Sequence, residues 1–433
     1  MKFRVVAPAL LAILLWTIDA HAVSLTLQGN GAGVEMNAAA AVYASDSAGA
    51  SRLITAVDEP SPDGGVFTEV GVPSMMPDGR VLFGAESKSG SLNPVWAIYI
   101  GNADAAPSRR VTTAITVKSQ QGDCAPAFRG DPYPVADADG NIAFMSTQIH
   151  DRDALFFYSH GNLSCLARAG SQTNEGHEIA VLSFGSPQIG DAGQVVFNAW
   201  LNLNVDKKLS ADKRAALPQA HRQALLMASA TGGISELAVE GELGPNRTRY
   251  ERPFGLPVAL ASPLGTMAAF TAKTESGAAL FLYSGGSMAR ILPVGTLTSL
   301  GPVSYLSPGR PGLMRDGTTA VLTGCAQIPA IFRLSRQRLD MRIARGQLTP
   351  FGTELESLGD PVLTASGAMF VGATDSDNHE KLYMLGGDDS FFEVGGAEMI
   401  YRISIVGGIH HHTIFTGTLS ANQHGDFSYL GGK

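Results

Sequence analysis

Residues 138–170 read ADGNIAFMSTQIHDRDALFFYSHGNLSCLARAG, and this stretch contains both units of a repeat that runs through the chain. The first unit is a small or polar residue, a glycine and an apolar run, which is typical of a tight turn followed by a β-strand. The second unit is a pair of short, largely alternating apolar strands joined by a polar turn, which indicates a β-hairpin. One copy of the repeat therefore predicts four short strands.

The first unit occurs seven times along the chain. Its central glycines, separated by 50 to 72 residues, are Gly79, Gly140, Gly193, Gly265, Gly317, Gly367 and Gly425. The second unit follows the first six of them, at residues 96–114, 154–170, 224–241, 279–295, 330–346 and 381–396. Four strands in a repeat of about fifty residues are typical of a propeller blade, because solenoid repeats are shorter or helical.

The seventh copy ends at Lys433 without its hairpin, while residues 40–58, AAVYASDSAGASRLITAVD, have the hairpin pattern without a preceding first unit. Joining the two ends would remove the exposed edge of an incomplete sheet. We therefore predict an all-β fold, a seven-bladed β-propeller with four-stranded blades whose last blade is closed by N-terminal strands. The alternative, a leading hairpin at 40–58, leaves two incomplete blades.

The N-terminus has the pattern of a signal peptide. Lys2 and Arg4 precede an apolar core at residues 5–16, and Ala20-His21-Ala22 fits a cleavage site. The core is too short to span a bilayer, which needs about twenty apolar residues. We expect a signal peptide at 1–22, a leader at 23–39, and one propeller domain at 40–433, without membrane insertion. The predicted location is the periplasm or the exterior of the cell.

The charge and the cysteines limit the partners and the covalent bonds. The net charge of -8 argues against a nucleic-acid partner, which requires clustered positive charge. The three cysteines match no zinc-binding spacing. Cys124 and Cys165 fall in adjacent parts of the repeat, and we predict a disulfide between them, with Cys325 as a buried thiol.

The first two copies of the repeat, which include VPSMMPDGRVLF and YPVADADGNIAF, resemble the TolB-like (WD40-like) repeats of bacterial propellers. In those repeats a proline-containing strand precedes Ser-Pro-Asp-Gly and an apolar strand. Only three copies here keep the Asp-Gly pair, at 78–79, 139–140 and 316–317. The resemblance implies a propeller and leaves the function open, because the repeat occurs in binding proteins and in peptidase-associated domains.

Two groups of side chains have the chemistry of metal ligands. Asp375 and Asp377 lie in an oxygen-rich loop of the sixth blade, which suits Ca²⁺ or another divalent metal, although a solvated acidic turn is the alternative. His410 and His412 share one face of a predicted strand, so both could bind one ion, although a structural role is the alternative. We expect no cofactor and assign no catalytic residue.

Residues 203–222 form the longest predicted connection between the second and third strands of a blade, in the third blade. This connection is either a lid, a docking element or a tolerated surface insertion. The face that carries these connections is the predicted functional face. We expect a monomeric, non-catalytic binding or scaffold protein for a protein or cell-envelope partner. The alternative is an axial-pocket hydrolase or lactonase, with metal assistance from Asp375, Asp377, His410 and His412.

Overall fold

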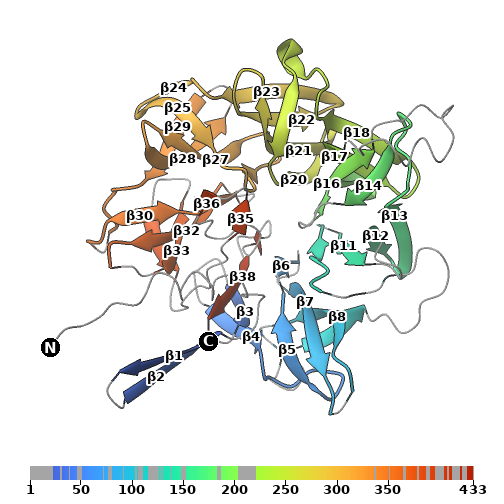
Figure 1. The fold of residues 1–433 in the computed structure, drawn as a ribbon, viewed down its shortest axis with the longest axis vertical. Helices are drawn as coiled ribbons and strands as arrows, with labels where there is room; N and C mark the ends of the chain where they lie inside the picture. The colour runs from blue at the N-terminus through green and yellow to red at the C-terminus, as the bar shows by residue number, and fades with distance from the viewer. Residues whose placement is uncertain are drawn as a thin grey trace.

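A computed structural model describes residues 23–45 and 51–394 with internal gaps, of which the longest are 116–125 and 203–220, and four short strands beyond Val394. The strands form sheets arranged as a ring around an axis (Figure 1). The predicted signal peptide at 1–22 lies outside the described residues. No helix in the described part of the chain is long and apolar enough to cross a membrane.

Six blades follow one another in chain order, and each is built from one continuous stretch. Blade 1 contains β5 (Val66–Val70), β6 (Ser74–Met75), β7 (Val81–Lys88), β8 (Val95–Gly101) and β9 (Val111–Ile115). Blade 2 contains β10 (Val135–Ala136), β11 (Ile142–Thr147), β12 (Asp153–Ser159) and β13 (Asn162–Arg168). Blade 3 contains β14 (Glu178–Leu182), β15 (Gln188–Ile189), β16 (Val195–Asn202), β17 (His221–Ser229) and β18 (Gly233–Val239).

Blade 4 contains β19 (Tyr250–Phe254), β20 (Val258–Ser262), β21 (Gly265–Thr274), β22 (Ala279–Ser284) and β23 (Ser287–Pro293). Blade 5 contains β24 (Leu297–Thr298), β25 (Gly301–Leu306), β26 (Gly312–Leu313), β27 (Thr319–Cys325), β28 (Ile328–Ser335) and β29 (Arg338–Ala344). Blade 6 contains β30 (Leu355–Leu358), β31 (Val362–Leu363), β32 (Met369–Asp375), β33 (Glu380–Leu385) and β34 (Phe391–Val394). Two short 3₁₀ helices, η2 (Asp191–Gly193) and η3 (Pro245–Arg247), lie in connections.

The two ends of the chain meet in a further sheet, which we call the terminal sheet. It has the strand order β37 (Ser420–Ala421), β38 (Phe427–Gly432), β3 (Ala40–Ser45), β4 (Ser51–Ala56). β3 and β38 pair antiparallel from Ala40 opposite Gly432 to Ser45 opposite Phe427, so the predicted pairing of the two ends is observed. β31 of blade 6 contacts β37, and β6 of blade 1 contacts β38, so the terminal sheet lies between these two blades.

The prediction of seven four-stranded blades is wrong. Among the described residues the ring has six blades, and five of the six have five or six strands. The extra strands arise because the first strand of these blades is divided into two segments that both pair with the next long strand, as β5 and β6 pair with β7. Two small separate sheets pair β1 (Val23–Gly29) with β2 (Ala32–Ala38) and β35 (Ser404–Val406) with β36 (Ile409–His411).

Glycine and proline account for the divided strands. The breaks fall at Gly255-Leu256-Pro257 in blade 4, at 307–311 in blade 5, and at Gly359-Asp360-Pro361 in blade 6. Proline has no backbone N–H to donate to a β-ladder, so the strand is interrupted where proline occurs. The inner segment then pairs again at the start of the long strand, as Gly312 and Leu313 pair with Ala320 and Thr319.

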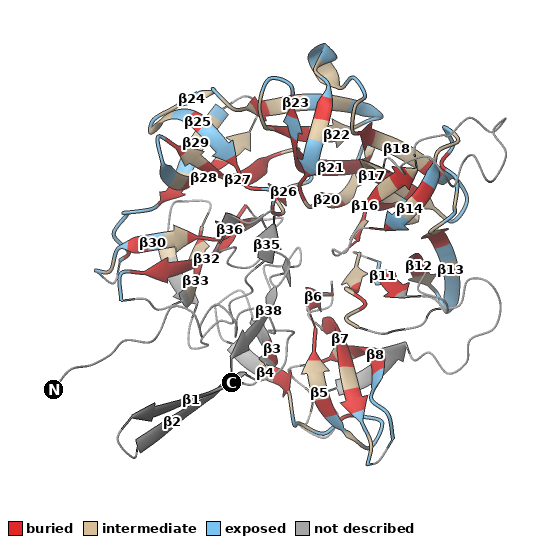
Figure 2. Cartoon of the chain, in the orientation of Figure 1, coloured by how far each residue is buried: buried red, intermediate tan, exposed pale blue. Residues whose placement is uncertain are grey.

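The core lies between neighbouring blades, where the long central strands are covered on both faces (Figure 2). Phe83 stacks on Tyr99 across β7 and β8, and Phe270 stacks on Phe281 across β21 and β22. One apolar cluster joins Val196 of blade 3 to the aromatic pair of blade 4. Because both faces are buried, the central strands read as nearly continuous apolar runs.

The predicted turn glycines adopt the backbone conformation that the sequence indicated. Those in the described turns have φ between 71° and 94°, in the left-handed region that favours glycine, and they are Gly140, Gly193, Gly265, Gly317 and Gly367. Gly79 and Gly425 lie outside the described residues. The predicted hairpins are observed in every blade, since the last two strands of each blade pair antiparallel.

Candidate functional site at the turn face

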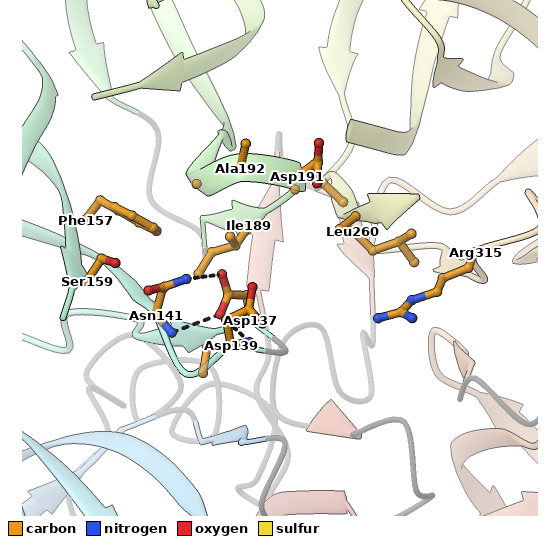
Figure 3. Close-up of a pocket in the computed structure, with 15 residues that line it drawn as sticks. Asp137, Asp139, Asn141, Phe157, Ser159, Ile189, Asp191, Ala192, Leu260 and Arg315 are labelled. Carbon is orange, nitrogen blue, oxygen red and sulfur yellow. Dashed lines mark hydrogen bonds between the residues drawn. The ribbon is translucent and has the colours of Figure 1, made fainter. Parts of the chain in front are cut away.

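A pocket of about 350 Å³ lies on the face that carries the glycine turns, between blades 2, 3, 4 and 5 (Figure 3). We call it the turn pocket. Its wall comes from the turn between β10 and β11, the turn between β15 and β16, strand β20, and Arg315 in the turn between β26 and β27. These turns lie next to the axis of the ring, because each joins the innermost segment of its blade to the long strand.

The turn at Asp137–Asn141 supplies a fixed negative charge. The Asp137 carboxylate accepts hydrogen bonds from the backbone N–H groups of Asp139 and Asn141, both at 2.9 Å, and from the Asn141 side-chain amide at 2.8 Å. These bonds hold the turn in one conformation, as aspartate does in Asx turns. The exposed Asp139 follows two residues later and adds a second carboxylate to the pocket wall.

The turn at Gly190–Gln194 is attached to the neighbouring blade. The backbone N–H of Asp191 donates to the Thr266 hydroxyl at 2.8 Å, and that hydroxyl donates to the Gln194 side chain at 2.6 Å. Gly193 has φ 71° and lies against the Phe157 ring, so a side chain there would collide with it. The turn thus places Asp191 and the exposed Ala192 at the pocket with little freedom.

Among the described residues that line the turn pocket, Arg315 is the one cation. Its turn is closed by hydrogen bonds from Met314 N–H to Thr318 carbonyl at 2.8 Å and from Gly317 N–H to Met314 carbonyl at 3.0 Å. The exposed side chain reaches into the pocket toward the turn that carries Asp137 and Asp139 (Figure 3). Carboxylates and a guanidinium therefore face each other across the pocket.

Apolar side chains line the wall beside these charges. Ile189 lies beside the acidic turn, Leu260 lies beside Asp191 and Arg315, and Phe157 lies beside Asn141 (Figure 3). Ile189 and Phe157 belong to the core cluster of blades 2 and 3, and Leu260 packs against the cluster of blades 4 and 5. The wall of the turn pocket is therefore a rigid part of the fold.

The predicted metal ligands are only partly described. Asp375 is fully buried at the end of β32, its carboxylate lies 3.3 Å from the Lys381 ammonium, and it accepts a hydrogen bond from the Asp377 N–H at 3.1 Å. Asp377 is exposed. His410 is part of β36, with only its backbone described, and His412 lies outside the described residues. The described residues hold no group of three or more side chains able to bind a metal ion.

The cysteines separate into two environments. Cys165 is disulfide-bonded, and Cys124 lies outside the described residues, so the pairing of these two stays a prediction. Cys325 is a free buried thiol, as predicted, and its sulfur lies 3.6 Å from the Thr323 hydroxyl.

The sequence predicts the functional site on the opposite face, which carries the long connection at 203–222. Residues 203–220 lie outside the described residues, so a role for that connection stays a prediction. The turn pocket was missed because its charges come from turns more than 170 residues apart, Asp137 and Arg315. The one available signal is the Asp-Gly pair at 139–140 and again at 316–317, which in the sequence indicates only the resemblance to TolB-like repeats.

Comparison with known proteins adds no argument about the fold or the function. No family model and no curated protein matches this sequence. Among solved structures, the Dos1 propeller is 9% identical, with 88% of this chain and 83% of that chain covered at a TM-score of 0.37. The acylaminoacyl peptidase of Pyrococcus horikoshii is 10% identical, with 77% of this chain and 46% of that chain covered at 0.42. The β-propeller domain of the Trilobed protease from Pyrococcus furiosus is 11% identical, with 76% of this chain and 97% of that chain covered at a TM-score of 0.32. At these values the similarities carry no argument about activity.

Proposed function

We propose that this chain is an exported, non-catalytic binding propeller, related to the TolB-like repeat proteins, that acts in the periplasm or outside the cell. Its partner is a protein or another component of the cell envelope, which enters the turn pocket with a polar group. The observation that carries this proposal is the pocket itself, in which carboxylates and a guanidinium on rigid turns face a shared space.

The construction of the turn pocket supports a binding role. Its polar groups sit on turns that are closed by backbone hydrogen bonds and attached to neighbouring blades. Groups that are already fixed lose little conformational freedom when a ligand binds, so more of the interaction energy appears as affinity. Binding residues occur more often on loops that a rigid scaffold holds in place, as the sheets hold these turns.

Site-specific photo-crosslinking tests the proposal in the cells that produce the protein. A photoreactive amino acid replaces Ala192, which is exposed at the pocket, or Leu348, which is 63% exposed on the connection between blades 5 and 6. The connections between blades lie at the opposite end of the strands from the glycine turns, so Leu348 is a control on the other face.

We expect a discrete covalent adduct with an envelope component from position 192 and none from position 348. Adduct formation should decrease when Arg315→Glu is added, because the charge opposite the acidic turn is then reversed. Equal labelling from both positions, or turnover of an ester or lactone by the purified protein that Arg315→Glu abolishes, would contradict a non-catalytic binding role for this pocket.

A further inference from the structure

The turn pocket has a negative end and a positive end. At one end are Asp137, held by its three hydrogen bonds, and the exposed Asp139. At the other end is Arg315, whose side chain makes no ion pair with any other described residue. A ligand charged at one end only would satisfy one of these groups and leave the other facing solvent or a like charge.

Between the two ends the wall of the turn pocket carries apolar side chains together with the Asp191 carboxylate. Ile189 and Leu260 occupy this stretch, and both are held by the packing between blades. Contact with these side chains favours an aliphatic or aromatic group in the middle of a ligand, because burial of apolar surface is favourable. A uniformly polar ligand such as a neutral sugar would leave this stretch unmatched.

We propose that the turn pocket binds a compact zwitterion with an apolar middle, the chemistry of a short apolar peptide with free ends. The ammonium group lies at the turn of Asp137 and Asp139, and the carboxylate lies on the Arg315 guanidinium, whose planar fork suits a bidentate contact. The pocket volume of about 350 Å³ is within the ordinary range for small-ligand sites. This inference rests on the proposed function only in placing the ligand in the same pocket, and it goes beyond that function by assigning the pocket a small ligand.

Isothermal titration calorimetry with defined peptides tests this assignment. The probes are the tripeptide Ala-Leu-Ala with free ends, the same peptide with an acetylated N-terminus, the same peptide with an amidated C-terminus, and free leucine. We expect the free-ended peptide to bind, and each capped form to bind at least about tenfold more weakly, since each loses one charge-assisted contact. Leucine distinguishes a site for free amino acids from a site for peptides, because it has both charges in a shorter molecule.

Two variants assign the ends of the peptide. The Arg315→Gln variant should bind the free-ended and the amidated peptide with equal affinity. It should still bind the acetylated peptide more weakly than the free-ended peptide. In the Asp139→Asn variant, acetylation of the N-terminus should weaken binding less than it does in wild type. Amidation of the C-terminus should weaken binding as much as it does in wild type. Arg247→Gln is the matched control, because Arg247 is an exposed arginine in η3 on the opposite face. Its replacement should change neither the affinity ratio of free to acetylated peptide nor that of free to amidated peptide.

The outcomes separate this inference from the proposed function. If capped and free peptides bind equally, or if none binds at about 10 mM, the zwitterion assignment is wrong even where crosslinking from position 192 succeeds. If the peptides bind with the expected dependence on Arg315 but no envelope adduct forms, the macromolecular partner is wrong and the zwitterion site stands. Discrimination against the amide that persists in Arg315→Gln would show that Arg315 does not bind the carboxylate.

Discussion

Asp360 is a buried residue whose ionisation is strongly affected by the fold. It lies in the strand break of blade 6, is 5% exposed, and its Oδ2 has no hydrogen-bond partner among the described residues. Burial raises the pKa of its carboxyl to about 7, although the Ser307 hydroxyl and the positive charge of Arg310 act in the opposite direction. Tyr305 also faces the carboxyl, and burial together with the negative charge of Asp360 raises the pKa of that phenol.

Replacing Asp360 with asparagine should remove a pH dependence of stability. The carboxyl holds its proton to about pH 7 when folded, against 3.8 as its ordinary value, so its contribution to stability is fully present below about pH 4 and is lost as the pH rises to 7. Urea unfolding at several pH values measures this. Between pH 4 and 7, wild type should lose stability relative to Asp360→Asn by up to about 1.4 kcal/mol per pH unit.

The control for this experiment is Asp139→Asn, which removes an exposed carboxylate from the turn pocket and should leave the pH profile of stability parallel to that of wild type. Parallel profiles for Asp360→Asn and wild type would show that Asp360 ionises in the folded protein as it does in the unfolded chain.

At the scale of elements, the strand breaks connect blade 3 to blade 4 and blade 4 to blade 5. Asn198 of β16 donates its amide to the Gly255 carbonyl in the break of blade 4, at 2.9 Å. Thr271 of β21 donates in the same way to the Ser307 carbonyl in the break of blade 5, also at 2.9 Å. The Arg310 guanidinium donates back to the Pro257 carbonyl at 2.9 Å. These bonds satisfy buried carbonyl groups that the interrupted β-ladder leaves unpaired.

Gly255→Ala should destabilise the interface between blades 4 and 5. A methyl group there would overlap the Thr271 hydroxyl and the backbone carbonyl of Pro308, which belongs to the neighbouring blade. Overpacking of this kind costs about 1–3 kcal/mol, measurable by denaturant unfolding. Gly130→Ala is the matched control, because a methyl group on Gly130 meets no atom within 4 Å. Equal stability of the two variants would mean that the break relaxes without cost.

At the scale of the whole molecule, the terminal sheet joins the two ends of the chain through β3 and β38. It lies between blade 6 and blade 1, since β37 contacts β31 and β38 contacts β6. Both neighbouring blades therefore depend on strands that are almost 400 residues apart in the sequence. The hairpin of β1 and β2 pairs only with itself among the described strands.

Deleting residues 40–58 should lower the thermal stability of the entire ring, because β38 loses its partner and the two neighbouring blades lose a packing surface. We expect the melting temperature, followed by circular dichroism on protein starting at Val23, to fall by more than about 5 °C. Trimming residues 23–35 should leave it unchanged. If the variant lacking residues 40–58 melts at the same temperature as the undeleted protein that starts at Val23, this role of the terminal sheet is refuted.

The sequence alone determined the strands, the hairpins, the glycine turns and the pairing of the chain ends. These features follow from local rules, namely the alternation of apolar residues and the need for positive φ at turns such as Gly140 and Gly317. The strand number was predicted wrongly, because an interrupted strand such as β25 and β26 is apolar on both sides of its break. The blade count was predicted wrongly, because the described strands of the seventh repeat copy, β37 and β38, lie with β3 and β4 in the terminal sheet. Only the tertiary structure decided where Asp137, Asp191 and Arg315 meet, since charges brought together by ring closure have no signature in local sequence.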